Sequence, residues 1–182
     1  MPNETPRDAV DGLATKLAAV ELAIFDVDGT LTDAGVTYGE KIEFQRFDVR
    51  DGQGLVWLRR AGVVLAWISG RGCPATERRA GELGVEELHL RAGPKGPVLE
   101  AIQTRLGIGP ERTLAMGDDA PDLALFDRSL VRCCPSDAVE PVRREADLIT
   151  TLPGGRGAAR EVADRVLAAK GVLKDFVEGS RR

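Results

Sequence analysis

The feature that most constrains the fold of this 182-residue chain is an alternation of short apolar runs with segments of helical spacing. The clearest apolar runs are residues 22–25, 63–68 and 112–116, and each is followed by polar residues or glycine. Strands that are apolar throughout are typical of a parallel sheet covered on both faces. Short connections between alternating strands and helices require right-handed crossovers. The pattern therefore predicts an α/β, Rossmann-like domain with helices on both faces of a parallel sheet.

The remaining elements follow the same rhythm along the chain. Further strands are expected at residues 87–90, 130–133 and 147–150. Apolar residues at helical spacing predict helices at 8–20, 54–60, 74–83, 97–106, 122–126, 138–145 and 158–169. A length of 182 residues suits one domain over 1–182. We expect its ends, residues 1–7 and 174–182, to be flexible.

Residues 33–48 interrupt this alternation with a predicted β-hairpin flap. Residues 36–38 and 42–47 form its two arms, and the second arm places Ile42 and Phe44 on the face opposite Glu43 and Gln45. Since an isolated hairpin is only marginally stable in water, this one needs a surface to pack on.

Composition excludes several classes of partner. The chain has 29 acidic and 25 basic residues, a net charge of −4 and 4% aromatic residues. This composition lacks the excess of basic residues and the aromatic side chains that are typical of nucleic-acid binding. The longest apolar run, residues 63–68, is far below the ~20 residues of a membrane-spanning helix, so no membrane partner is expected. Cys73, Cys133 and Cys134 show no disulfide or zinc spacing, and residues 1–7 carry no apolar secretory segment. We therefore expect free thiols and a cytoplasmic protein.

Carboxylates follow two strands that are predicted to lie in one sheet. Asp26 and Asp28 come after the first strand, and Asp118 follows the strand at 112–116. Ligands of an open parallel sheet bind beyond the carboxyl ends of its strands. Carboxylates at i and i+2 repel each other unless they share a cation or one holds a proton. Alone, Asp-x-Asp-Gly also suits a simple turn. The convergence predicts that Asp26, Asp28 and Asp118 hold Mg²⁺, which prefers oxygen ligands.

Such a site suits phosphoryl transfer to a carboxylate. Asp26 would attack phosphorus and form an aspartyl-phosphate. Asp28 would protonate the leaving alkoxide and then accept a proton from the hydrolytic water. The chemistry therefore assigns Asp26 as nucleophile and Asp28 as acid and base.

Further polar residues at the same edge would support the phosphate. Ser69 and Gly70 would hold a phosphoryl oxygen, and Lys95 would offset negative charge as a catalytic cation. Asp119 or Asp122 would fix Lys95 or a metal-bound water. Taken singly, Ser69 also suits a helix cap and Lys95 a solvated surface residue.

In this order the residues resemble the four motifs of the haloacid dehalogenase-like phosphohydrolases. The motifs are Asp26-Val-Asp-Gly-Thr-Leu-Thr32, Ser69-Gly70, Lys95 and Gly117-Asp-Asp-x-x-Asp122, and the resemblance spans about residues 20–172. An acid at position 28 is typical of the phosphatase and phosphomutase branches. The resemblance implies a Mg²⁺-dependent phosphomonoesterase.

The resemblance extends to one capless branch of these hydrolases. Between Asp28 and Ser69 there is room for a hairpin but not for a cap domain. A chain with a hairpin at this point and no cap domain resembles the family of 3-deoxy-D-manno-octulosonate 8-phosphate phosphatases. The resemblance also includes the sequences of residues 47–54, 79–84 and 154–158. That resemblance implies a small sugar-acid phosphate as substrate and a role in lipopolysaccharide biosynthesis. It also implies a homotetramer in which the flaps assemble and a neighbouring subunit completes each active site.

Substrate contacts are assigned to four residues, with alternatives left open. The octulosonate phosphatases typically carry Arg at the position of Arg71, whereas relatives acting on nine-carbon ulosonate 9-phosphates carry Glu. The carboxylate of a sugar acid is well matched by the two parallel donors of a guanidinium, so Arg71 and Arg79 are the first candidates. Arg50 and Thr32 are further candidates. A nine-carbon ulosonate 9-phosphate or another small phosphate remains an alternative substrate. A receiver-like phosphoacceptor signalling domain remains an alternative of another class.

Overall fold

The computed structural model describes residues 6–40 and 42–181 and contains a six-stranded parallel sheet. The strand order is β5-β4-β1-β6-β7-β8, and every neighbouring pair is parallel. The strands are β1 (Leu22–Phe25), β4 (Val64–Ile68), β5 (Glu87–His89), β6 (Thr113–Met116), β7 (Val131–Cys134) and β8 (Leu148–Ile149). The predicted α/β class and parallel sheet are confirmed.

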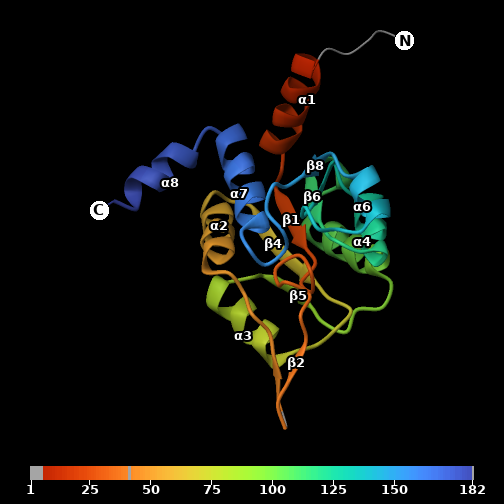
Figure 1. Cartoon of the computed structure of the whole chain (residues 1–182). Coiled ribbons are helices and arrows are strands. Elements are labelled where there is room, and N and C mark those ends of the chain that lie inside the picture. Colours follow the sequence, from red (N-terminus) through yellow and green to blue (C-terminus); the bar gives the residue numbers. More distant parts are fainter. Residues whose placement is uncertain (1–5, 41, 182) are drawn as a thin grey trace.

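Helices cover both faces of this sheet (Figure 1). One face packs against α1 (Pro6–Ala18), α2 (Val49–Arg60), α3 (Pro74–Leu83), α7 (Ala158–Ala169) and α8 (Leu173–Gly179). The other packs against α4 (Lys95–Leu106), α5 (Leu123–Phe126) and α6 (Glu140–Glu145). Two short 3₁₀ helices, η1 (Pro110–Arg112) and η2 (Ala120–Asp122), flank β6. None of the helices in the described ranges combines the length and apolar character that a membrane crossing requires.

The central strand β1 divides the core into two clusters. Ala23 and Phe25 pack toward α2 and α7, whereas Leu22 and Ile24 pack toward α4 and α5. All four side chains are fully buried. Successive side chains of a strand point to opposite faces, so a strand covered on both sides must be apolar throughout.

Helix α2 begins at Val49 rather than at the expected residue 54. Asp48 caps it, because its carboxylate accepts a hydrogen bond from the backbone N–H of Arg50. Gly52 and Gly54, residues typical of turns, lie inside the helix. A side chain at Gly54 would come within 2.9 Å of the Arg160 side chain on α7, so glycine permits close helix packing there.

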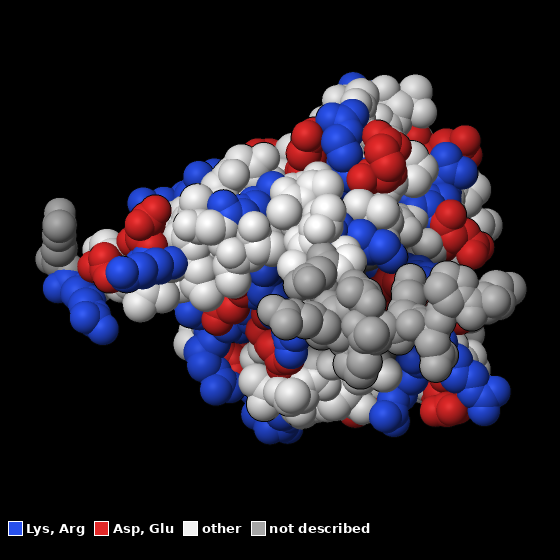
Figure 2. Space-filling view, turned by 90° about the horizontal axis from the view of Figure 1, so that it is seen from above, with Lys and Arg blue, Asp and Glu red and all other residues white. Residues whose placement is uncertain are grey.

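The segment 174–182, expected as a flexible end, lies largely within helix α8. Phe176 stacks on Trp57 of α2 with ring centroids 5.8 Å apart, and the Arg60 guanidinium lies 5.6 Å from the Phe176 ring. These aromatic contacts hold α8 against α2. In Figure 2 α8 projects from the body at the left, and acidic and basic side chains are interspersed over the visible face. Of the other predicted flexible end, residues 1–7, Pro6 and Arg7 belong to helix α1, and residues 1–5 lie outside the described residues.

The predicted hairpin is present, with shorter arms than expected. Strands β2 (Thr37–Tyr38) and β3 (Glu43–Phe44) pair antiparallel and project beyond the carboxyl ends of the sheet (Figure 1). Tyr38, Ile42 and Phe44 are 74%, 58% and 52% exposed. Between β1 and α2 the described residues form this hairpin and no further domain, in agreement with the prediction that there is no cap domain.

Candidate active site

The loop after β1 brings Asp26 against the end of β6. The backbone N–H of Asp26 donates to the carbonyl of Met116 at 2.9 Å, which continues the β1–β6 ladder by one residue. The loop then turns tightly, since the N–H groups of Leu31 and Thr32 both donate to the Val27 carbonyl. Asp26 is consequently held almost completely buried beneath the loop.

Glycine at position 29 lets this loop lie directly on Asp118. Gly29 has a φ of +101°, and an added Cβ would lie 2.1 Å from Asp118 Oδ2. Thr30 reinforces the contact, because its hydroxyl donates to Asp118 Oδ1 at 3.0 Å. The two motifs are therefore joined by both close packing and a hydrogen bond.

Three carboxylates form what we call the acidic cluster, defined as Asp26, Asp118 and Asp122. Each offers an oxygen within 4.8 Å of the others. Asp122 is held by the backbone N–H groups of Asp118 and Asp119, which donate to its Oδ2 at 2.9 and 3.2 Å. The carboxyl ends of β1 and β6 thus bring together residues separated by nearly a hundred positions.

Lys95, at the start of α4, joins two members of the acidic cluster. Its Nζ lies 2.5 Å from Asp26 Oδ1 and 2.6 Å from Asp122 Oδ1. The Lys95 side chain is only 8% exposed. Burial by itself would lower the Lys95 pKa, but Asp26 and Asp122 outweigh it and raise the pKa. Lys95 is therefore an ammonium ion buried between two carboxylates.

The acidic cluster holds more negative charge than Lys95 balances. Burial, followed by the charge of Asp122, raises the pKa of Asp26 well above its usual value. Burial, again followed by Asp122, raises the pKa of Asp118 to about 6. Buried carboxylates that repel one another in this way are stabilised by a bound cation. Since the cluster offers only oxygen ligands, it fits a hard divalent ion such as Mg²⁺.

The Asp28 side chain is not part of the acidic cluster and contacts the hairpin. The Ser69 hydroxyl donates to Asp28 Oδ2 at 3.0 Å, and Gln45 Nε2 donates to Asp28 Oδ1 at 2.9 Å. Arg71 Nε lies 3.6 Å from the same Oδ1. The predicted metal set thus differs from the cluster in one member. The Asp28 side chain stands outside the cluster, and Asp122, expected only as support, stands within it.

The other predicted support residues are placed in different ways. Ser69 is buried, and its hydroxyl accepts the backbone N–H of Arg71, the residue that follows Gly70. The Asp119 carboxylate caps η2 by accepting the N–H of Ala120. Of the two acids proposed to fix Lys95, it is therefore Asp122 that contacts the ammonium.

Thr32, a predicted substrate contact, has its hydroxyl engaged inside the loop. The hydroxyl accepts the N–H of Gly29 at 3.3 Å and donates to the Val27 carbonyl at 3.2 Å. The residue is 2% exposed. Thr32 therefore stabilises the loop after β1.

Of the three predicted substrate arginines, Arg71 is the one that contacts the site. Its guanidinium pairs with Glu43 at 2.6 Å, and Glu43 raises the Arg71 pKa. Arg50 instead pairs with its neighbour Asp48 at 2.6 Å. Arg79 pairs with Glu82 at 3.3 Å and lies against α2. Within one chain, Arg50 and Arg79 therefore make structural contacts.

Two site residues were not identified from the sequence. Gln45 was placed on the inward face of the hairpin arm by alternation, but nothing in the pattern linked it to Asp28. Thr30 lies within the first motif, yet its bond to Asp118 spans 88 positions. Only the folded chain brings these pairs together.

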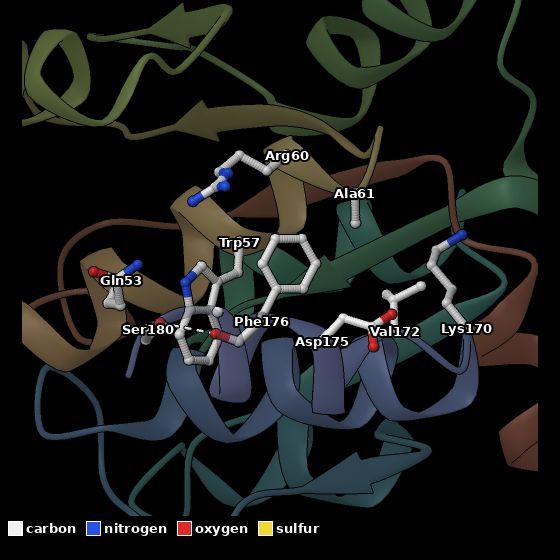
Figure 3. A pocket seen from close by; sticks show the side chains of 10 residues that line it. Gln53, Trp57, Arg60, Ala61, Lys170, Val172, Asp175, Phe176 and Ser180 are labelled. Carbon is white, nitrogen blue, oxygen red and sulfur yellow. Dashed lines mark hydrogen bonds between the residues drawn. The ribbon is translucent and has the colours of Figure 1, made fainter. Parts of the chain in front are cut away.

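A cavity of about 850 Å³ lies away from this chemistry, between α2 and α8. Figure 3 shows the rings of Trp57 and Phe176 within it, with Arg60 and Lys170 nearby. None of the residues assigned to catalysis, metal or phosphate lines this cavity. Cavity size and converging charge thus point to different places in the molecule.

Comparisons with known proteins agree with the motifs. A family model for haloacid dehalogenase-like hydrolases matches residues 91–160. The 3-deoxy-D-manno-octulosonate 8-phosphate phosphatase KdsC of Haemophilus influenzae is 35% identical over 164 residues, which cover 88% of this chain and 90% of that protein. A probable YrbI family phosphatase from Pseudomonas syringae has a similar structure, with a TM-score of 0.91 and 38% identity over 94% of this chain and 98% of that one. The corresponding phosphatase from Moraxella catarrhalis, crystallised with a magnesium ion, a phosphate ion and KDO, has a TM-score of 0.90 and 33% identity over 93% of this chain and 98% of that one.

Proposed function

Since the chain belongs to the haloacid dehalogenase-like hydrolases, we propose that it is a phosphomonoesterase acting on 3-deoxy-D-manno-octulosonate 8-phosphate or a closely related sugar-acid phosphate. The observation that carries this proposal is the acidic cluster bridged by Lys95, with Asp28 beside it. A receiver-like signalling domain is set aside, because family membership argues against it and Asp26 follows the first strand.

The acidic cluster would prepare Asp26 as the nucleophile. Asp26, Asp118 and Asp122 would hold Mg²⁺, which when bound would neutralise charge on the phosphate and on the carboxylates. Lys95 holds Asp26 Oδ1 and favours its charged form against the effect of burial. Ser69, with the backbone N–H of Gly70, would bind a phosphoryl oxygen.

Asp28 would serve both chemical steps. In the first, an Asp26 oxygen bonds to phosphorus, the bond from phosphorus to the alkoxide breaks, and Asp28 gives its proton to the leaving oxygen. In the second, Asp28 takes a proton from a water molecule that attacks the aspartyl-phosphate. Inorganic phosphate leaves, and the Asp26 carboxylate is restored.

Arg71 would recognise the carboxylate of the sugar acid. It lies 3.6 Å from Asp28 Oδ1, and its side chain is 42% exposed, so a substrate could reach it from solvent. A planar guanidinium binds a carboxylate through two parallel hydrogen bonds. To do so, Arg71 would exchange its present partner Glu43 for the substrate.

A phosphate-release panel tests the substrate. With Mg²⁺, we expect kcat/KM for octulosonate 8-phosphate to exceed that for nine-carbon ulosonate 9-phosphates and hexose phosphates by at least about 10-fold. Asp26→Asn serves as the blank. A preference for the nine-carbon substrates would move the assignment to them, and no release from any monoester would refute the enzyme proposal.

We also propose a cytoplasmic homotetramer whose flaps meet. The exposed Tyr38, Ile42 and Phe44 on the hairpin support this arrangement, since they offer apolar surface for a neighbouring subunit. Light scattering would give the assembly size. Deleting residues 36–46 should abolish both the tetramer and turnover, and an active tetramer without the hairpin would refute this arrangement.

A further inference from the structure

We propose that Gln45, carried by the hairpin, is a positioning residue that orients the Asp28 carboxylate and is itself fixed by Thr76 of α3. This inference rests on the proposed phosphatase function and adds a residue to it. Gln45 Nε2 donates to Asp28 Oδ1 at 2.9 Å, and the Thr76 hydroxyl donates to Gln45 Oε1 at 2.5 Å. One amide thus connects the hairpin, the loop after β1 and α3.

Asp28 and Thr76 together determine the orientation of the Gln45 amide. Thr76 is 2% exposed, so its hydroxyl has little access to water as an alternative partner. When it donates to Gln45 Oε1, the amide must present its Nε2 to the acceptor Asp28. A reversed amide would set its oxygen against a carboxylate oxygen, which is repulsive. The chain of bonds therefore defines a single amide orientation.

With Gln45 in place, both oxygens of the Asp28 carboxylate have a donor. Ser69 donates to Oδ2 and Gln45 to Oδ1. In turnover, Ser69 would turn toward the phosphate, which leaves Gln45 as the uncharged donor that retains Asp28. Gln45 adds no charge of its own to that of Arg71, whose Nε lies 3.6 Å from the same Oδ1.

Gln45 also ties Asp28 to the position of the flap. It follows β3 directly, and Glu43 on the same face of the arm pairs with Arg71 at 2.6 Å. The intervening Phe44 points outward and is 52% exposed. The inward face of this arm thus contacts both the acid and base Asp28 and the candidate carboxylate ligand Arg71.

The test compares two leaving groups in the full-length protein. An alkoxide leaving group needs the proton of Asp28, whereas p-nitrophenolate leaves without one. In Gln45→Leu we expect kcat/KM for octulosonate 8-phosphate to fall about 10–100-fold. The kcat/KM for p-nitrophenyl phosphate should fall less than about 3-fold. Since kcat/KM reports the steps up to aspartyl-phosphate formation, slow hydrolysis of that intermediate would not mask the difference.

Thr76 supplies the matched control. Thr76→Val removes the hydroxyl at nearly constant shape and should reproduce the selective loss in part, whereas Thr76→Ser should restore the wild-type ratio of the two substrates. Equal losses for both leaving groups, or none, would overturn the positioning role.

A crystal structure of Gln45→Leu tests the same inference without activity. We expect the Asp28 carboxylate to leave its present position or to occupy more than one rotamer, while Lys95 keeps its contacts with Asp26 and Asp122. An Asp28 that stays in place would refute the inference. If the wild type hydrolyses no phosphate monoester, the proposed function fails, yet this structural measurement still decides the role of Gln45.

Discussion

At the carboxyl ends of β1 and β6 three carboxylates converge, and two of them contact one buried ammonium, whereas the cavity between α2 and α8 is formed around stacked aromatic rings. Trp57, at the centre of the second region, is 5% exposed and lies beneath the Arg160 guanidinium at 4.3 Å. Burying aromatic surface stabilises a fold, while burying like charges costs free energy. Costly convergence of charge, more than cavity size, therefore identifies the candidate active site.

The largest expected effect would follow from removing the proposed nucleophile, Asp26. Asp26→Asn keeps the shape of the side chain and should lower kcat for phosphate release by at least about 10⁴-fold, because no aspartyl-phosphate can form. Steady-state phosphate release would measure the loss. The exposed Asp127→Asn offers a matched control and should retain activity. Substantial turnover by Asp26→Asn would break the contrast between the two regions.

An opposite pattern is expected in the aromatic region. Trp57→Ala should lower the free energy of unfolding by about 3–5 kcal/mol, since it leaves a cavity and frees Phe176 on α8. The kcat/KM per folded molecule should stay within about 3-fold of the wild type. Urea unfolding and phosphate release would measure the two quantities. A loss of activity without a loss of stability in Trp57→Ala would contradict the purely structural role of the aromatic region.

A smaller effect, on the dependence of stability on pH and Mg²⁺, should distinguish the acidic cluster from the aromatic region. The folded-state pKa of Asp118 is about 6 against an ordinary value of 3.8, so the folded chain keeps this proton to higher pH than the unfolded chain. The contribution of Asp118 to the free energy of unfolding without metal should therefore decline by roughly 1–3 kcal/mol as the pH rises from about 4 to about 6. The difference in unfolding free energy between the wild type and Asp118→Asn separates this contribution from that of carboxyls whose pKa is lowered, such as Asp147 and Glu161.

Mg²⁺ should reverse this decline, because it binds the ionised cluster of the folded state. Thermal unfolding at pH 5 and pH 7.5, with EDTA or with Mg²⁺, would measure the effect. The increase in Tm on adding Mg²⁺ should be larger at pH 7.5. An equal increase in Tm at both pH values would indicate that Mg²⁺ binds outside the acidic cluster. As a control, Trp57→Phe should leave the pH dependence of the Tm increase unchanged.

Much of the fold was predictable from local pattern. The bounds of β1 and α3 agree with those expected, because continuous apolar runs and helical spacing report burial directly. The start of α2 was misplaced by five residues, since Gly52 and Gly54 suggest a turn by composition. Their actual role depends on how closely α3 and α7 approach, which no local pattern encodes.

Local pattern was enough to predict the strand ends that carry Asp26, Ser69 and Asp118, because runs of consecutive apolar residues indicate strands of one parallel sheet. Two features emerge only in the folded chain: the Asp122 side chain, rather than that of Asp28, belongs to the acidic cluster, and Gln45 contacts Asp28. Side-chain direction at a loop or hairpin depends on packing between distant segments. Periodicity along the chain carries no information about such contacts.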